Sequence, residues 1–476
     1  MGAAKSAPFT LSKITMDATP NALAPLNRTQ GWTTGMLLLA LAATRLIAAS
    51  SYMSTEPLPV ATDWRTLSED AVTYDMPAYN LLAGYGYSGS LVAPHEPSAL
   101  RTPTYPLTLA AVYTMFGRSS LAAVAANVLF DFIAAVFLFG VARRKLPAWW
   151  AIAFLGAVVV LAPWSCFLGR RLTEPLATML VSASLYLLML PASSKRWLGL
   201  GVCLGMLVMC RPVFALLPVV LAFWALSDHA VGLRKDLARP VAAMIVGVLL
   251  CWGPWTVRNA VVFDRFIPLA VAGTGLSLWA STWHDGGRYW QVKEGPDGEI
   301  TRTLPDQAFA SDAERKRVVP AFDHYIELFF SGGGGLAIAE PDRKLREVAL
   351  DKIRERPVDW MALRARRTVH LLAQRYFITG EILDTRSSVE RARRGLQVRR
   401  FFGQIAWVIA ILSGLGILLS VLKPSWRPVS IVFLYTWLIH FPTHALPRYL
   451  APGYGAAMLL AIFAIHQSYA KLRHRV

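Results

Sequence analysis

The chain has 476 residues, of which 55% are hydrophobic and only 16% are charged, and its formal net charge is +18. A soluble domain usually carries about 25% charged residues, so this composition excludes an ordinary soluble protein. The positive charge does not indicate a nucleic-acid-binding protein, because much of it lies in short segments between hydrophobic blocks, where lysine and arginine mark the cytoplasmic side of a membrane.

Ten hydrophobic segments are predicted to cross the membrane as helices. A helix needs about 20 apolar residues to span a bilayer, and lipid offers no partners for the unpaired backbone groups of other structures. In chain order, the segments are residues 35–53, 121–141, 149–168, 175–190, 197–210, 212–227, 241–262, 402–422, 429–443 and 449–468. If both termini are cytoplasmic, the basic clusters between segments fall inside. The predicted fold class is therefore an all-α polytopic membrane protein.

This topology divides the chain into four parts. Residues 1–34 form a cytoplasmic leader, and residues 35–262 form a transmembrane core with a first external loop at 54–104. Residues 263–400 form a long external region, whose length exempts it from the positive-inside rule. Residues 401–476 supply the last transmembrane helices and a basic cytoplasmic tail.

The external region has a helical pattern in its second half. Apolar residues between Arg343 and Val369 recur at helical spacing, which predicts amphipathic helices lying on the membrane surface. These positions are Leu345, Val348, Ala349, Ile353 and Leu363. Residues 364–400 hold ten arginines against three carboxylates. This segment is expected to bind anionic lipid headgroups, or the acceptor if that is an anionic lipid.

The most conspicuous polar stretch runs from Asp63 to Pro106, between the first two hydrophobic segments. Glu69 and Asp70 stand at the start of a helix-like run, where the helix dipole and free N–H groups favour negative charge. Glycines and prolines then end the run and turn the chain back toward the bilayer. Because the chain around it is lipid-soluble, this pair of carboxylates indicates a functional loop.

Six short motifs follow one another along the chain. They are Glu69-Asp70-Ala71-x-x-Tyr74, Ala78-x-Asn80-Leu81-x-x-Gly84-x-Gly86-Tyr87-Ser88, Arg101-x-Pro103-x-Tyr105-Pro106, Thr173-Glu174-Pro175, Pro254-Trp255-Thr256-Val257-Arg258-Asn259 and Arg448-Tyr449-x-x-Pro452. As an ordered set, these motifs resemble bacterial GT-C glycosyltransferases of the family 39 type. These enzymes are relatives of protein O-mannosyltransferases and of the transferase that puts aminoarabinose on lipid A.

The resemblance implies a GT-C-like bundle of about ten transmembrane helices, with external juxtamembrane helices, a periplasmic loop region and a catalytic core within residues 35–262. It also implies an inverting glycosyltransferase of the bacterial inner membrane whose active site faces the periplasm. Such an enzyme moves a sugar from a polyprenyl-phosphate donor to a hydroxyl or phosphate of a lipid, protein or glycan acceptor. Membrane lipids are the other expected partners, and nucleic acid is not one.

The chemistry of this reaction fits the residue types in the motifs. One carboxylate acts as general base and makes the acceptor hydroxyl nucleophilic. Arginine stabilises the departing phosphate, because its guanidinium matches phosphate oxygens bidentately. The phosphate is already a good leaving group, so the second carboxylic acid that glycoside hydrolysis needs is not required.

The resemblance assigns roles to particular residues. Asp70 is the expected base, with Glu69 as its partner in the catalytic pair. The donor phosphate is expected to bind Arg258, Arg448 and Arg101. Arg171 is added to this set because an arginine on the outer side runs against the positive-inside rule, which favours a phosphate-facing role. The other expected substrate-binding residues are Glu174, Tyr74, Tyr105 and Tyr449.

Simpler interpretations of these residues stay open. Asp70 can be an ordinary helix N-terminal charge, with Glu69 or Asp63 as the base in its place. Glu174 can belong to a structural ion pair, and Arg258 can extend toward lipid headgroups.

Other polar residues lie within the hydrophobic segments. Arg45 is a site candidate because intramembrane charge is costly. Asn127 and Asp131 share one helix face, which favours a polar contact between helices. His440 and His444 have a spacing that binds metal on a helix, but no third ligand is evident. The sequence therefore requires no cofactor, and dependence on a divalent metal stays open.

Three tryptophans, Trp279, Trp283 and Trp290, are expected in an aromatic belt at the membrane interface, with stacking on a sugar as the alternative.

Two other functions compete with the transferase. One is a transporter or flippase for a lipid-linked sugar, which predicts broken helices in paired halves. The break at Arg211-Pro212 is the only such interruption. The other is a polysaccharide polymerase or ligase, which the early acidic loop disfavours.

Overall fold

The structure is a computed structural model that describes residues 25–51, 70–90, 92–161, 167–227, 234–284, 291–294, 300–332, 335–372, 389–444 and 446–473. Glu69, Asp63 and Trp290 lie outside the described residues. So do most of the cytoplasmic leader and residues 373–388 of the arginine-rich segment.

Each of the ten predicted hydrophobic segments contains a helix. These helices are α1 (Arg28–Ser51), α4 (Ser120–Lys145), α5 (Ala148–Leu161), α6 (Glu174–Leu188), α7 (Ser194–Cys210), α8 (Leu217–Ser227), α9 (Arg234–Phe263), α14 (Val389–Leu422), α15 (Arg427–Leu438) and α16 (Ala451–Arg473). Among the described residues, five helices are long and apolar enough to cross a membrane, namely those within 28–50, 120–145, 238–263, 403–422 and 447–473. The prediction of an all-α polytopic membrane protein is confirmed.

The remaining elements lie mostly outside these segments. They are α2 (Asp70–Leu82), α3 (Thr104–Phe116), α10 (Thr274–Ser281), α11 (Asp312–Phe330), α12 (Ala339–Glu355), α13 (Pro357–Leu372), and the 3-10 helices η3 (Pro212–Phe214), η5 (Asp306–Ala308), η6 (Pro424–Trp426) and η7 (Pro447–Leu450). Within the described ranges, the one sheet is an antiparallel hairpin of β1 (Gln291–Glu294) and β2 (Ile300–Thr303).

Small residues and one buried ion pair hold the apolar helices together. A Cβ on Gly201 of α7 would lie 2.0 Å from the carbonyl oxygen of Met244 in α9, so the two helices approach at backbone distance. Such small-residue contacts are typical of helix packing in membranes. Arg45 of α1 donates to Asp131 of α4 at 2.7 Å and to the carbonyl of Val158 in α5 at 2.7 Å. Arg45 is therefore part of the bundle core, and the predicted polar helix contact of Asp131 is confirmed.

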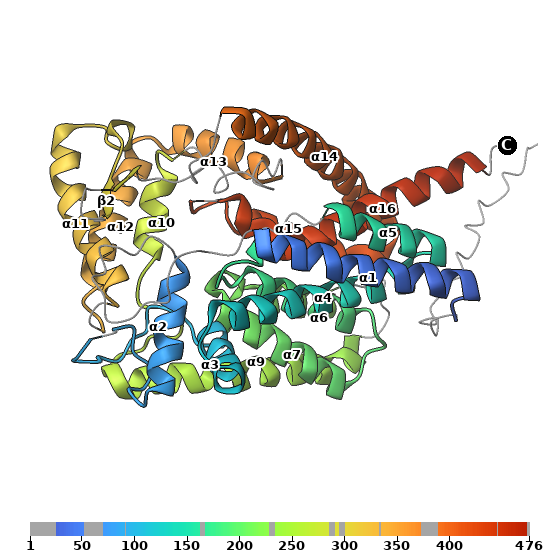
Figure 1. Cartoon of the computed structure of the whole chain (residues 1–476), viewed down its shortest axis with the longest axis horizontal. Helices are drawn as coiled ribbons and strands as arrows, with labels where there is room; N and C mark the ends of the chain where they lie inside the picture. The colour runs from blue at the N-terminus through green and yellow to red at the C-terminus, as the bar shows by residue number, and fades with distance from the viewer. Residues whose placement is uncertain are drawn as a thin grey trace, which may run out of the picture.

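Helices α10, α11 and α12 form a second, smaller core at one end of the molecule (Figure 1). Leu345, Val348 and Ala349 of α12 are buried there. The predicted helical periodicity is confirmed, but its placement on a membrane surface is wrong, because this apolar face packs against α10 and α11. Trp279 is 0% exposed in the same core, so it is not part of an interfacial belt.

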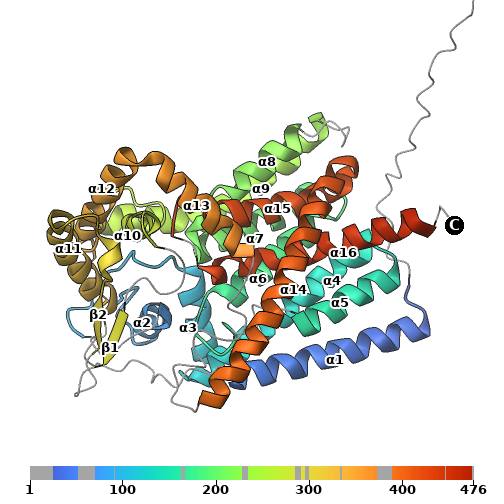
Figure 2. The same ribbon diagram turned by 90° about the horizontal axis from the view of Figure 1, so that it is seen from above.

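Helix α2 lies between this smaller core and the bundle of apolar helices (Figure 2). Val72 and Met76 belong to the smaller core, whereas Ala78 belongs to the core of the bundle. The helix that begins at Asp70 therefore joins the two packing units, and its polar residues lie at their boundary.

Candidate functional site

Asp70 meets two arginines that are distant in sequence. It is the first residue of α2, where the helix dipole favours a carboxylate. Arg101 Nη2 donates to its Oδ1 at 3.2 Å, and Arg448 Nη2 donates to its Oδ2. Arg101 is fixed further by a 2.8 Å hydrogen bond from its Nε to Thr73 Oγ1, one turn along α2. The three charged groups therefore form one cluster in front of α2.

Glu174 extends this cluster to the start of α6. Its Oε1 lies 3.0 Å from Arg211 Nη1 and 3.7 Å from Arg448 Nε. Arg448 thus bridges two carboxylates, Asp70 and Glu174, that come from different helices. We call Asp70, Arg101, Glu174, Arg211 and Arg448 the arginine cluster. It is assembled from the ends of several elements at one end of the bundle.

Aromatic rings lie against the guanidinium groups of this cluster. The guanidinium carbon of Arg101 lies 4.4 Å from the ring centre of Tyr74 and 4.9 Å from that of Phe329. The guanidinium carbon of Arg211 lies 5.3 Å from the ring centre of Tyr449, and that of Arg448 lies 5.6 Å from it. Cation–π contacts of this kind hold a guanidinium in place while its N–H groups stay free for an anion.

Three members of the arginine cluster are partly exposed to solvent, whereas the side chains of Arg211 and Glu174 are only 12% and 3% exposed. The exposed fractions of the side chains are 31% for Asp70, 21% for Arg101 and 23% for Arg448. Burial raises the pKa of Asp70, but the charges of Arg448 and Arg101 outweigh it and lower this pKa to about 2. Asp70 is therefore ionised at neutral pH. Three arginines against two carboxylates leave the cluster with a surplus positive charge.

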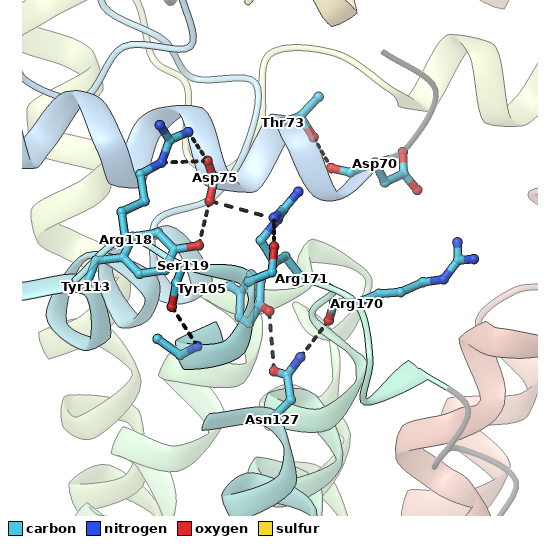
Figure 3. Close-up of polar contacts among 12 residues, drawn as sticks. Asp70, Thr73, Asp75, Tyr105, Tyr113, Arg118, Ser119, Asn127, Arg170 and Arg171 are labelled. Atoms are coloured by element: carbon cyan, nitrogen blue, oxygen red, sulfur yellow. Dashed lines mark hydrogen bonds and ion pairs between the residues drawn. The ribbon is translucent and has the colours of Figure 1, made fainter. Parts of the chain in front are cut away.

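A second ionic group lies further along α2, around Asp75 (Figure 3). Asp75 is 0% exposed and accepts hydrogen bonds from Tyr113 at 2.5 Å and from Arg118 Nε at 3.2 Å. Arg171 Nε lies 3.9 Å from the same carboxylate. The predicted phosphate ligand Arg171 thus pairs with Asp75 and not with Asp70, and its side chain is only 3% exposed.

Two further predicted residues lie outside the arginine cluster. Arg258 donates to the carbonyl oxygens of Ser98 at 2.9 Å and Tyr87 at 3.3 Å, so its guanidinium fastens a loop to α9. Tyr105 is 0% exposed, and its hydroxyl lies 3.3 Å from Asn127 Oδ1 in the core. Neither side chain presents a free polar group beside Asp70.

Six of the predicted residues do come together. They are Asp70, Arg101, Arg448 and Glu174, with the rings of Tyr74 and Tyr449 against the guanidinium groups. Sequence reasoning missed Arg211, which it treated only as a break in an apolar run, and Asp75. The sequence signal for Arg211 is a charged residue at the end of a hydrophobic segment. In the structure it lies at the end of α7 and pairs with Glu174 at the start of α6. For Asp75 the sequence offers no comparable signal.

The described residues contain no group of three His, Cys, Asp or Glu side chains that could hold a metal ion. His440 and His444 are both buried and flank the ring of Tyr449, with centre-to-centre distances of 5.2 Å and 5.9 Å.

Comparisons with known proteins come from structures alone. No family model and no curated protein matches the chain. ArnT from Cupriavidus metallidurans bound to undecaprenyl phosphate matches with 17% identity and a TM-score of 0.39, over 91% of this chain and 77% of that chain. The archaeal oligosaccharyltransferase AglB from Archaeoglobus fulgidus, in complex with an inhibitory peptide and a dolichol-phosphate, matches with 11% identity and a TM-score of 0.46.

The match to AglB covers 93% of this chain but only 52% of that chain, so this chain spans about half the length of AglB. At these identities and TM-scores, the likeness assigns neither an activity nor a substrate to this chain, and a functional assignment has to rest on the site itself.

Proposed function

We propose that this protein is an inverting glycosyltransferase that takes a sugar from a polyprenyl-phosphate donor and transfers it to an acceptor group. Asp70 acts as the general base, and Arg101, Arg211 and Arg448 bind the donor phosphate. The observation that carries this proposal is the arginine cluster, in which three arginines converge on two carboxylates at the end of a bundle of apolar helices.

The charge of the cluster suits a lipid-linked phosphate. Three arginines and two carboxylates leave one positive charge, and the phosphodiester of a polyprenyl-phosphate sugar carries one negative charge. Its position at the ends of membrane helices lets the polyprenyl chain stay in lipid while the phosphate reaches the guanidinium groups. Charge-assisted hydrogen bonds from arginine to phosphate are among the strong ones in proteins.

The same arginines connect donor binding to the base. Asp70 with a pKa of about 2 is a weak base, whereas a base works best with a pKa near the operating pH. A donor phosphate competes with Asp70 for Arg448 and Arg101, and this competition raises the pKa of the carboxylate. The acceptor hydroxyl then attacks the anomeric carbon from the face opposite the phosphate, its proton passes to Asp70, and the phosphate leaves on the arginines.

The orientation of the site is part of the proposal. The arginine cluster lies at the N-terminal ends of α6 and η7, whereas the basic residues Arg143, Lys145, Lys471 and Arg473 lie at the C-terminal ends of α4 and α16. By the positive-inside rule, this arrangement supports an orientation with the cluster outside the cytoplasm. In a cysteine-free background, Arg346→Cys should react with a membrane-impermeant maleimide in intact cells, and Lys471→Cys should not. The reverse labelling pattern would contradict this orientation.

The activity is tested with the purified protein in detergent, a radiolabelled polyprenyl-phosphate sugar, and lipid, protein and glycan acceptors. Asp70→Asn should lower turnover by about 10²–10⁴-fold, which is the range for loss of a general base. The matched control is Asp131→Asn, which neutralises a buried carboxylate that pairs with Arg45 and is not a member of the cluster. Wild-type turnover in Asp70→Asn would remove Asp70 from the mechanism. Vesicle assays that show sugar-lipid movement without transfer would favour a flippase instead.

A further inference from the structure

The second carboxylate of α2 has no place in the proposed chemistry. Asp75 is fully buried, so neither donor nor acceptor can reach it. Its partners are nevertheless numerous and come from three separate parts of the bundle: Tyr113 in α3, Arg118 before α4 and Arg171 before α6 (Figure 3). A buried carboxylate with this many partners fixes the segment that carries it.

Helix α2 depends on such anchoring. It has 13 residues, and helices of this length are marginal without tertiary contacts. Pro77 lies within it and lacks the N–H that would bond back to Thr73. The packing of α2 is also divided, because Val72 and Met76 face the smaller core while Ala78 faces the bundle. Apolar contacts therefore hold α2 on two sides, and the buried carboxylate of Asp75 adds polar contacts to the bundle.

The contacts of Asp75 constrain the rotation of α2 about its axis at a second point. Residues five positions apart on a helix are separated by about 7.5 Å along the axis and by about 140° around it. Asp75 can therefore bind the bundle on one side of α2 while Asp70 faces Arg101 and Arg448 on another. Arg171 precedes Glu174 by three residues, so one short segment contacts Asp75 directly and, through Arg448, also Asp70.

We infer that Asp75 is a positioning residue for the proposed base: its contacts with Tyr113, Arg118 and Arg171 set the orientation in which Asp70 faces the arginine cluster. This inference rests on the proposed function. Glu174, Arg211 and Arg448 do not lie on α2 and have no contact with Asp75 among the described interactions. Loss of the Asp75 contacts should therefore impair the base while most of the phosphate-binding groups stay in place.

Two variants test this in the full-length protein. Asp75→Asn should lower turnover by about 10–100-fold, because misplacement of a reacting group by about 1 Å has effects of this size. Tyr113→Phe removes one hydrogen bond to Asp75 and keeps the charges, so it should lower turnover by a smaller factor, about 3–10-fold, and serves if Asp75→Asn folds poorly. Both should bind polyprenyl phosphate within about threefold of wild type, and turnover is expressed per phosphate-binding site.

A double-mutant cycle separates positioning from general stabilisation. If Asp75 acts through Asp70, then Asp75→Asn or Tyr113→Phe should cost less than about threefold in an Asp70→Asn background, whose remaining activity comes from phosphate binding. The matched control Asp131→Asn should change turnover by the same factor in both backgrounds. The inference would be overturned if Asp75→Asn, or Tyr113→Phe, lowered turnover by the same factor in the wild-type and the Asp70→Asn background. That result would leave the proposed function intact. Wild-type turnover in Asp70→Asn itself would refute the base assignment and the inference together.

Discussion

Helix α2 carries two aspartates whose surroundings differ in accessibility and not in residue type. Asp70 pairs with Arg101 and Arg448 and is 31% exposed, whereas Asp75 pairs with Arg118 and Arg171 and is 0% exposed. An accessible carboxylate can give up its arginine partners to an anionic ligand, because water solvates the charged groups while the partners change. A buried carboxylate cannot, since an uncompensated charge in the interior is costly. Accessibility, and not the presence of arginine, is therefore the difference between the two aspartates, and it supports the proposal that Asp70 is the residue that reacts.

The largest expected effect is on the free energy of unfolding, when an arginine partner of the buried Asp75 is removed. Arg118→Ala removes a guanidinium from Asp75 and leaves a buried carboxylate poorly compensated, so it should lower the free energy of unfolding by about 3–5 kcal/mol. Thermal unfolding in detergent measures this change. Binding of polyprenyl phosphate at low temperature, per folded protein, should stay within about threefold of wild type. If Arg118→Ala lowered the affinity for polyprenyl phosphate without lowering stability, the structural role of Asp75 would be contradicted.

The next effect is on ligand binding. Arg448→Ala removes a guanidinium from the accessible cluster, and a hydrogen bond to a charged group contributes about 1.5–3 kcal/mol, which is about 10–100-fold in affinity. The dissociation constant of polyprenyl phosphate should rise by that factor, as measured by titration in detergent. Arg448→Lys keeps the charge without the bidentate geometry and should recover part of the affinity. Unchanged affinity in Arg448→Ala would exclude this arginine from the phosphate site.

A smaller effect appears in the pH dependence of stability. The pKa of Asp70 is about 2 in the folded protein, below its ordinary value of 3.8. The stabilisation this provides is present above about pH 4 and is lost as the pH falls toward about 2, because the unfolded chain takes up the proton first. With the side chain partly exposed, we expect about 1 kcal/mol. Asp70→Asn should therefore flatten the decrease in melting temperature between pH 5 and pH 3, and an identical profile would count against the arginine contacts.

The smallest effect concerns Arg258. Its guanidinium donates to backbone carbonyls of Ser98 and Tyr87, and not to the arginine cluster. Arg258→Ala should change the affinity for polyprenyl phosphate by less than about threefold, although it should lower the melting temperature. A tenfold weaker affinity would return Arg258 to the phosphate site that the sequence motifs suggest for it.

Local and compositional features were predictable from the sequence. The hydrophobic segments correspond to helices because lipid requires long apolar stretches, and the start of α2 at Asp70 follows from the preference of carboxylates for helix N-termini. The helical period of residues 345–349 was also correct. The predicted packing partner of this helix face, the membrane surface, was wrong. An apolar helix face packs equally well against a membrane or against another helix, and here it packs against α10 and α11.

The helices, the membrane-protein class and the acidic start of α2 could therefore be predicted, because each depends on residues close together in the chain. The pairing of each arginine with a carboxylate depends instead on how the helices pack. Asp70 and Arg448 are 378 residues apart, and Asp75 and Arg171 pair only once α2 packs against the start of α6. An ion pair forms between whichever charges the packing of the helices brings together, and no spacing along the chain records that choice.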